Sequence, residues 1–261
     1  MAFTVHAVMP GVWHIVDCMG VCMTLLEGEN AAMLVDTGYG IEDVADFMRH
    51  MTDLPLTVFL THNHHDHAMG ARCFPETYML EADMADWRMF TDDKMRRRVL
   101  TQAIGKNLPV DEKTFLAGEI PLPKVMKPGV IDLGGLTAEI IEAPGHTPGS
   151  AVVYVPERKL LLSGDDWNPC TWLFFPQALG LREYRSNMRG IQQLPFEKVL
   201  CPHREALYDR WMLDDFFNAL TDGNLRAAEP VNIAPYEQID TCQATLPHDQ
   251  VFVFDWAKSG L

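Results

Sequence analysis

Histidines gather at one point of this chain, directly after the short apolar run 56–60. Four of the ten histidines lie within residues 62–67, together with Asp66. Side chains of an extended segment alternate between two sides, so His62 and His64 leave the backbone on the same side and can bind one metal ion. If the chain turns after His64 and a helix begins at Asp66, Asp66 and His67 can reach a second metal. The pattern therefore predicts a metal site at a strand end, and its density disfavours the alternative of a polar surface loop.

A site for two metals needs further His or Asp ligands from other strand ends. His146 lies in the segment 143–150, Ala-Pro-Gly-His-Thr-Pro-Gly-Ser, where a Pro/Gly loop would hold it with little entropy to lose. Asp165 follows the apolar run 160–162 and suits a carboxylate shared by two cations. His203 follows a short predicted strand, whereas His248 lies in a polar stretch, so His203 is the better candidate ligand.

Taken in order, these motifs resemble the metallo-β-lactamase superfamily. His-x-His-x-Asp-His, Gly-His-Thr-Pro-Gly-Ser, Ser-Gly-Asp and a late strand-end histidine follow one another between about residues 31 and 204. That superfamily includes glyoxalase II-like thioesterases, lactonases, β-lactamases and phosphodiesterases. The resemblance implies an α/β (α+β) fold, a four-layered αββα sandwich with the site at one edge of its sheets. It also implies a ligand set: His62, His64 and His146 for one metal, Asp66, His67 and His203 for the other, and Asp165 bridging the two.

The resemblance further implies that Asp36, in the segment Val-Asp-Thr-Gly, hydrogen-bonds toward the ligand cluster. The chain departs from the family pattern in two places. His203 stands in Cys-Pro-His-Arg instead of between glycines, and the residues after Asp165 lack the GCGR stretch of glyoxalase II and the persulfide dioxygenases. We therefore do not expect glutathione-linked chemistry. Four aromatic residues in this region either line an apolar pocket or belong to the core: Trp167, Trp172, Phe174 and Phe175.

The apolar patterns along the chain predict short strands and helices in alternation. Strands are expected at 12–16, 21–26, 32–35, 56–60, 136–141, 151–155, 160–162, 197–200 and 251–254, and helices at about 41–51, 82–104, 182–194 and 206–220. No Pro/Ser-rich linker divides the chain, so we expect a single domain over 1–261. An α-rich insertion at about 82–128 would form a lid or a dimer surface, and its Arg96-Arg97-Arg98 triplet a solvated face.

Composition narrows the class of protein. The 261 residues are 48% hydrophobic, enough for a large core, and 21 basic against 36 acidic residues give a net charge of −15. Such a charge disfavours nucleic acid and anionic membranes as partners and leaves a small-molecule substrate. The N-terminus lacks a signal-peptide pattern, which predicts a cytoplasmic protein. Six cysteines without a CxxC pair predict reduced thiols, and a homo-oligomer is left open.

The expected function is that of a metal-dependent hydrolase acting on a small ester, thioester, lactone or amide. Two divalent cations, zinc first and iron or manganese as alternatives, would lower the pKa of a bridging water to near 7 and so supply hydroxide as the nucleophile. Asp66 would orient that nucleophile or take up its proton. The alternatives are a phosphodiesterase acting on a small phosphoester and a mononuclear-iron oxidoreductase of the same fold.

Overall fold

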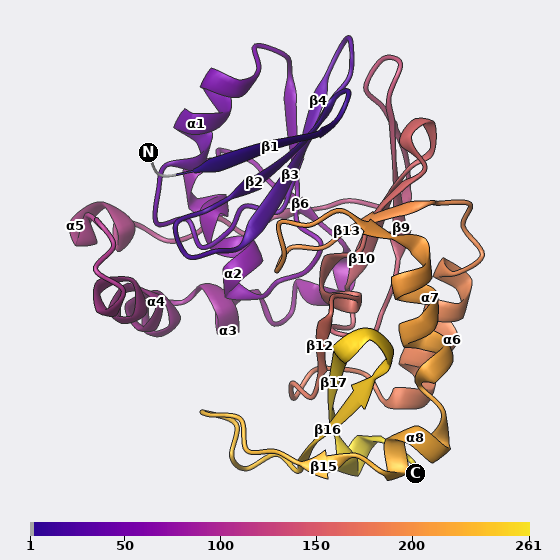
Figure 1. The fold of residues 1–261 in the computed structure, drawn as a ribbon. Helices are drawn as coiled ribbons and strands as arrows, with labels where there is room; N and C mark the ends of the chain where they lie inside the picture. Colours follow the sequence, from indigo (N-terminus) through magenta and orange to yellow (C-terminus); the bar gives the residue numbers. More distant parts are fainter. Residues whose placement is uncertain (1–2) are drawn as a thin grey trace.

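Two stacked sheets form the body of the computed structural model, which describes residues 3–261 (Figure 1). The first sheet follows chain order, with antiparallel pairing from β1 to β4 and parallel pairing from β4 to β7. Its strands are β1 (Thr4–Met9), β2 (Val12–Val16), β3 (Cys22–Glu27), β4 (Ala32–Val35), β5 (Leu56–Phe59), β6 (Tyr78–Met79) and β7 (Lys124–Val125). The second sheet has the order β14-β13-β11-β10-β9-β8. Its strands are β8 (Gly129–Asp132), β9 (Thr137–Glu142), β10 (Ala151–Val155), β11 (Leu160–Leu162), β13 (Lys198–Leu200) and β14 (Tyr208–Asp209).

Three apolar layers hold these sheets and their helices together. Side chains of both sheets, such as Val35 and Phe59 from one and Val153 and Leu162 from the other, form the layer between them. The opposite face of the first sheet packs against α1 (Val44–Met51), and that of the second sheet against α6 (Leu181–Ile191) and α7 (Arg210–Ala219). Figure 1 shows α1 on one side of the sheets and α6 with α7 on the other. The predicted four-layered αββα sandwich is therefore confirmed.

A third, four-stranded sheet was not predicted. It has the order β12-β17-β16-β15 and consists of β12 (Cys170–Leu173), β15 (Glu229–Pro230), β16 (Thr241–Leu246) and β17 (Gln250–Asp255). Residues of β16 and β17 join the apolar layer beneath α6 and α7, and the short helix α8 (Asp222–Arg226) precedes β15. The extra sheet extends the second half of the molecule below the sandwich in Figure 1.

The helical region expected at 82–104 is broken into two helices. α3 (Trp87–Thr91) ends before Asp92, whose side chain accepts a hydrogen bond from Met95 N and so caps α4 (Asp93–Gly105). The short α5 (Glu112–Phe115) follows. Val99, Leu100 and Ala103 of α4 pack with residues such as Leu60 and Met69 near the end of the first sheet.

The prediction that the arginine triplet is a solvated face is wrong for Arg96. This side chain is 3% exposed and donates hydrogen bonds to the carbonyl oxygens of Phe115, Ala117 and Gly118. Those carbonyls lie at the end of α5 and beyond it, where backbone acceptors lack helical partners. A guanidinium with several donors satisfies them together, and a sequence pattern cannot report such a contact.

Most strand predictions agree with the structure, whereas two helices begin late, and the helix expected at about 41–51 begins at Val44. The bounds of β2, β4, β10 and β11 are those predicted. The helix expected over 206–220 begins at Arg210, because Tyr208 and Asp209 pair with β13 as β14. Among residues 3–261, no helix combines the length and the apolar character needed to cross a bilayer.

Candidate metal centre

The predicted ligands come from separate segments that meet at one edge of the sandwich. His64 precedes the short helix α2 (His65–Ala68), which follows β5, and His146 lies in the loop between β9 and β10. Asp165 and His203 follow β11 and β13, which are parallel neighbours and so end at the same edge. Within residues 3–261, candidate ligand atoms lie within 4.8 Å of one another in three groups: His62–His64–His146, His62–His67–Asp165 and Asp66–His67–His203.

The first group has ring nitrogens aimed at one point. His64 Nδ1 and His146 Nε2 are 2.9 Å apart, and His62 Nε2 is buried without a hydrogen-bond partner among the described residues. An orphaned buried nitrogen is costly unless something binds it. The carboxylate of Asp165 lies beside this group, with Oδ2 3.5 Å from His146 Nε2 and 4.0 Å from His62 Nε2. Imidazole nitrogens in this arrangement suit a divalent transition metal such as zinc.

The third group, Asp66–His67–His203, combines histidines with a carboxylate, and Asp165 lies beside it. His203 Nε2 is 3.1 Å from Asp165 and 3.7 Å from Asp66 Oδ2. His67 Nε2 is 3.5 Å from Asp165 Oδ2 and 3.7 Å from Asp66 Oδ2. Asp165 thus lies beside histidines of the first group and of the third group. A carboxylate shared by two cations requires this position. The donor chemistry of both groups therefore fits a pair of divalent ions.

The first and third groups differ in the charge that their side chains favour. Burial lowers the pKa of His62 and of His64 well below the usual value, and neighbouring histidines add to the effect. Burial also opposes charge on His67, but Asp165, Asp66 and Asp36 outweigh it and raise the pKa of that residue. The pKa of Asp66 falls to about 2 because His67, His65 and His203 overcome the effect of burial. Neutral histidines thus face one metal position and an ionised carboxylate the other.

Asp36 orients histidines of both groups. It follows β4 with φ at +65°, a left-handed conformation that Asp adopts more readily than most residues. Its Oδ2 is 3.0 Å from His67 Nδ1, as the expected contact toward the ligand cluster requires. Thr61 donates both its backbone N–H and its hydroxyl to Asp36, and that hydroxyl oxygen lies 3.1 Å from His62 Nδ1. One carboxylate thus leaves Nε2 of both histidines directed into the site.

Two further residues support the histidines, and no motif signalled either of them. The side-chain amide of Gln177 lies 2.6 Å from His64 Nε2, on the ring edge opposite His146. Asp83 accepts hydrogen bonds from Asn63 N, Thr147 Oγ1 and Gly149 N, and so joins the loops that carry His64 and His146. A Cβ at Gly149 would stand 2.6 Å from the Asp83 backbone nitrogen and carboxyl carbon, so this close approach requires glycine.

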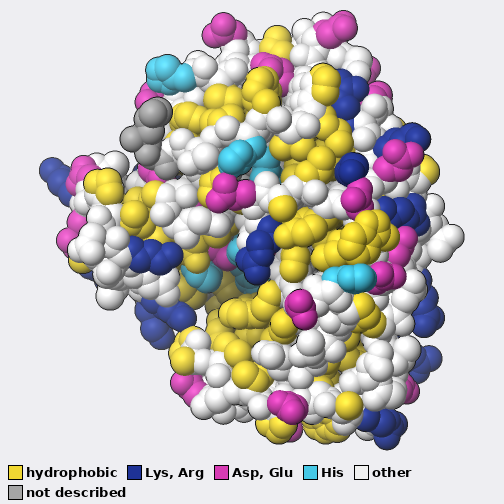
Figure 2. Space-filling view, in the orientation of Figure 1, with side chains coloured by type: hydrophobic (Ala, Val, Ile, Leu, Met, Phe, Trp, Pro, Cys, Tyr) yellow, Lys and Arg dark blue, Asp and Glu magenta, His cyan; other side chains and the backbone are white. Residues whose placement is uncertain are grey.

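An open pocket of about 450 Å³ lies over the ligand groups. Figure 2 shows histidine and hydrophobic atoms within a hollow between the α3–α4 region and the C-terminal sheet, with Lys or Arg side chains beside it. The sequence left open whether four aromatic residues line a pocket or belong to the core, and the structure places two of them in each environment. Trp172 and Phe175 line the pocket, whereas Trp167 and Phe174 are fully buried in the core. Phe90 of α3 also lines it, with its ring centroid 4.5 Å from that of His64.

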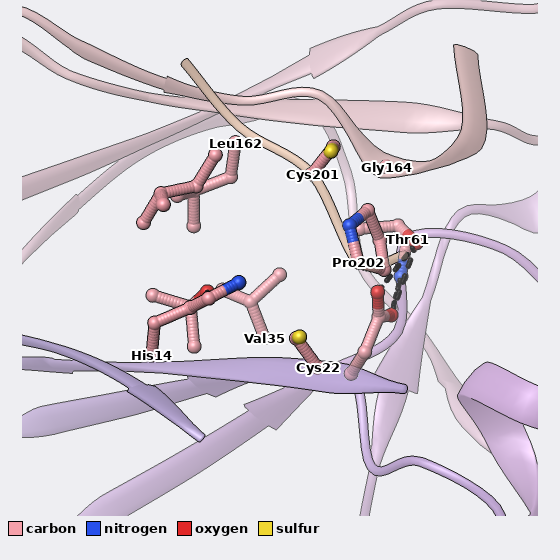
Figure 3. A pocket seen from close by; sticks show the side chains of 11 residues that line it. His14, Cys22, Val35, Thr61, Leu162, Gly164, Cys201 and Pro202 are labelled. Atoms are coloured by element: carbon pink, nitrogen blue, oxygen red, sulfur yellow. Dashed lines mark hydrogen bonds between the residues drawn. The ribbon is translucent and has the colours of Figure 1, made fainter. Parts of the chain in front are cut away.

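A second, much smaller cavity lies between the two sheets, behind Asp36. Its volume is about 10 Å³, and His14, Cys22 and Cys201 face it together with Thr61 (Figure 3). A space of this size is close to the minimum for one water molecule. This cavity is too small for a substrate. The 450 Å³ pocket lies over the ligand groups and is therefore the candidate binding site.

Comparisons with known proteins agree with the fold. The family model of the metallo-beta-lactamase superfamily matches residues 16–203. A metallo-beta-lactamase from Pontibacter korlensis has a similar structure with a TM-score of 0.60 and 18% identity, over 84% of this chain and 99% of that one. The sec-alkylsulfatase Pisa1 from Pseudomonas sp. gives a TM-score of 0.63 and 16% identity, over 85% of this chain and 42% of that one.

A similarity in sequence extends to a curated protein. Acyl-coenzyme A thioesterase MBLAC2 of Gallus gallus is 26% identical over 168 residues, which are 57% of this chain and 59% of that protein. The matched part thus spans somewhat less than two thirds of the curated relative. Since the family model covers most of the chain, including all seven predicted ligands, this protein belongs to the metallo-beta-lactamase superfamily.

Proposed function

We propose that this protein is a binuclear metal-dependent hydrolase of small acyl substrates, with thioesters as the first substrate class and esters, lactones and amides next. The observation that carries the proposal is the convergence of seven side chains, from four segments distant in sequence, into groups of ligand atoms within 4.8 Å of one another. His62, His64 and His146 would hold one ion, Asp66, His67 and His203 the other, and Asp165 both. Zinc is the metal that a set of imidazoles and carboxylates favours.

When bound, two divalent cations would lower the pKa of a water molecule and polarise a substrate carbonyl. Residues of the chain would supply the proton acceptor and the apolar surroundings of the reaction. Asp66 lines the pocket and is ionised at neutral pH, so it can accept a proton or orient an attacking water. Phe90 and Phe175 cover His64 with apolar surface, which excludes bulk water beside the reacting group.

Thioesters come first because of the curated relative and the chemistry of the pocket. The relative is named an acyl-coenzyme A thioesterase, and the pocket offers aromatic side chains on which an acyl chain can lie. A net charge of −15 disfavours long polyanions, so nucleic acids are poor substrates. A small phosphoester is the competing substrate class.

The test combines metal analysis of the purified protein with a panel of thioesters, lactones and phosphodiesters. We expect up to two zinc ions per chain and hydrolysis of thioesters. Asp66→Asn should lower kcat at least a hundredfold with little change in the thermal unfolding temperature of the metal-free protein, since Asp66 is at the pocket surface. His248→Asn is the matched control, because His248 is exposed and pairs with Asp215. Turnover by metal-free protein, or turnover of phosphodiesters alone, would contradict the proposal.

A further inference from the structure

Both apolar and basic side chains line the pocket above the ligand groups. The apolar wall includes Phe175, whose ring centroid is 4.7 Å from that of His64 and 5.2 Å from that of His146, and Phe90, whose ring centroid is 4.5 Å from that of His64. Phe90 is 4% exposed, so this wall is deep. An apolar substituent of a substrate would be buried here.

The basic side chains are Arg98 and Arg204. Arg98 is exposed on α4 and lines the pocket with Gln102, which lies one turn further along the same helix face. Arg204 directly follows His203 and is also exposed at the pocket. Its only hydrogen bond as a side-chain donor within residues 3–261 is to the carbonyl oxygen of His203, at 2.7 Å.

Neither arginine has a carboxylate partner within 4.0 Å among the described residues, whereas the neighbouring Arg97 pairs with Asp93 at 2.9 Å. Arg98 also acts on the tyrosines of the pocket. Burial raises the pKa of Tyr39 and of Tyr236, and the positive charge of Arg98 counteracts the effect at both residues. Arg98, Tyr39 and Tyr236 all line this pocket.

Unpaired arginines are unusual at the binding pocket of a chain with a net charge of −15. At physiological ionic strength, charges farther away than about 8 Å are largely screened, so a ligand in the pocket responds mainly to the local groups. Guanidinium groups bind phosphate and carboxylate oxygens with charge-assisted hydrogen bonds. Their position at the exposed mouth lets an anionic group remain partly hydrated, while the deep apolar wall would not tolerate one.

We propose that Arg98 and Arg204 bind an anionic group, phosphate or carboxylate, on the leaving-group side of an acyl substrate whose apolar acyl portion lies against Phe90 and Phe175. This inference rests on the proposed hydrolase function and adds to it the substrate class and the orientation. The arginines are specificity-determining residues and take no part in the bond cleavage.

The test compares three thioesters that differ in where charge is placed. Octanoyl-coenzyme A carries phosphates on the leaving group, octanoyl-N-acetylcysteamine carries no charge, and glutaryl-N-acetylcysteamine carries a carboxylate on the acyl group. Arg98→Gln and Arg204→Gln should each raise KM for octanoyl-coenzyme A roughly tenfold and leave kcat nearly unchanged. Neither change should affect KM for the uncharged thioester. Arg97→Gln is the matched control, and Arg98→Lys should recover most of the loss.

A binding measurement keeps the result independent of turnover. Desulfo-coenzyme A, which has no thiol to bind a metal, should bind the wild-type protein and bind Arg98→Gln about tenfold more weakly by titration calorimetry, with the difference shrinking at high salt. Equal effects of Arg98→Gln on charged and uncharged thioesters would overturn this inference and leave the hydrolase function standing. Preference for the glutaryl thioester would overturn the orientation. If no thioester is hydrolysed, the choice of thioesters as the first substrate class fails, and the calorimetric comparison alone decides whether the arginines bind an anion.

Discussion

Asp36 shows how much of this site depends on a residue that contacts no reacting group. It accepts from Thr61 and lies 3.0 Å from His67 Nδ1, so one carboxylate sets the ring orientation of His67 directly and that of His62 through the Thr61 hydroxyl. The resemblance in sequence predicted the contact toward the cluster, because Asp36 lies in a motif. The part played by Thr61 is visible only in three dimensions.

Asp83 is the supporting residue with the clearest pH dependence. Burial raises its pKa to about 6, although Thr147, Gly149 and Asn63 donate hydrogen bonds to it. In an unfolded chain the pKa of an aspartate is about 3.9. Between these values the folded protein holds a proton that the unfolded chain has lost, so the contribution of Asp83 to stability is greatest below about pH 4 and falls as pH rises to 6.

We therefore expect the free energy of unfolding of wild-type protein, minus that of Asp83→Asn, to fall by about 3 kcal/mol as pH rises from about 4 to 7. Urea unfolding of both proteins in chelator, at several pH values, measures this difference. Asp53→Asn serves as the control, because Asp53 is exposed. A difference that stays constant, or rises with pH, would show that Asp83 is ionised throughout.

At the scale of elements, the segment from α3 to α5 brings Phe90, Arg98 and Gln102 to the pocket. The sequence predicted helix there but could not show which face of it is buried. Arg96 has its guanidinium inside, bonded to carbonyl oxygens at and beyond the end of α5, while Arg97 and Arg98 on the same helix are exposed. Three consecutive arginines thus have three different roles: an internal donor, a surface ion pair and a pocket residue.

Arg96→Met should loosen this segment without unfolding the sandwich. The methionine keeps much of the apolar stem but leaves three carbonyl groups without donors, at a cost of about 2–4 kcal/mol to local stability. Hydrogen exchange should accelerate in residues 93–120 and stay unchanged in β10 and β11, and KM should rise because Arg98 loses its position. Arg97→Met is the control. Unchanged exchange in 93–120 would mean that packing of Val99 and Leu100 alone holds the segment.

At the scale of the whole molecule, the apolar layers do not depend on the candidate ligands. Residues such as Val153, Leu161 and Phe216 are fully buried away from the histidines, between the sheets or beneath the helices. The site therefore lies on a body that we expect to fold without metal. This differs from small zinc domains, in which the ion supplies the free energy of folding.

Removal of metal by a chelator should abolish hydrolysis while far-UV circular dichroism stays unchanged. Since a ligand at about a hundred times its Kd adds about 2.7 kcal/mol to stability, the unfolding temperature should fall by about 5–10 °C. Readdition of zinc should restore both activity and temperature. Collapse of the dichroism signal on chelation would instead make the metal part of the folding core.

The sequence by itself determined the apolar strands near the site, to within a residue at their ends, and the candidate ligands that follow them. Runs such as 32–35, 151–155 and 160–162 are apolar throughout because both sheet faces are covered. Such a run can be recognised from a few consecutive residues, without knowledge of distant parts of the chain. His62–His67, His146, Asp165 and His203 were found because their motifs are short and stand directly after such runs. The order of the motifs was sufficient to indicate the superfamily and its αββα layers.

Only the tertiary structure decided what depends on partners far away in the chain. β12 forms by parallel pairing with β17, so Cys170 lies beside Val251, and neither short segment indicates the other. Packing put Trp167 and Phe174 in the core and Trp172 and Phe175 in the pocket, although all four belong to one aromatic stretch. The environment of a side chain depends on the elements that pack against it. A local sequence pattern gives the type of each residue, but it does not show which distant residues will contact it.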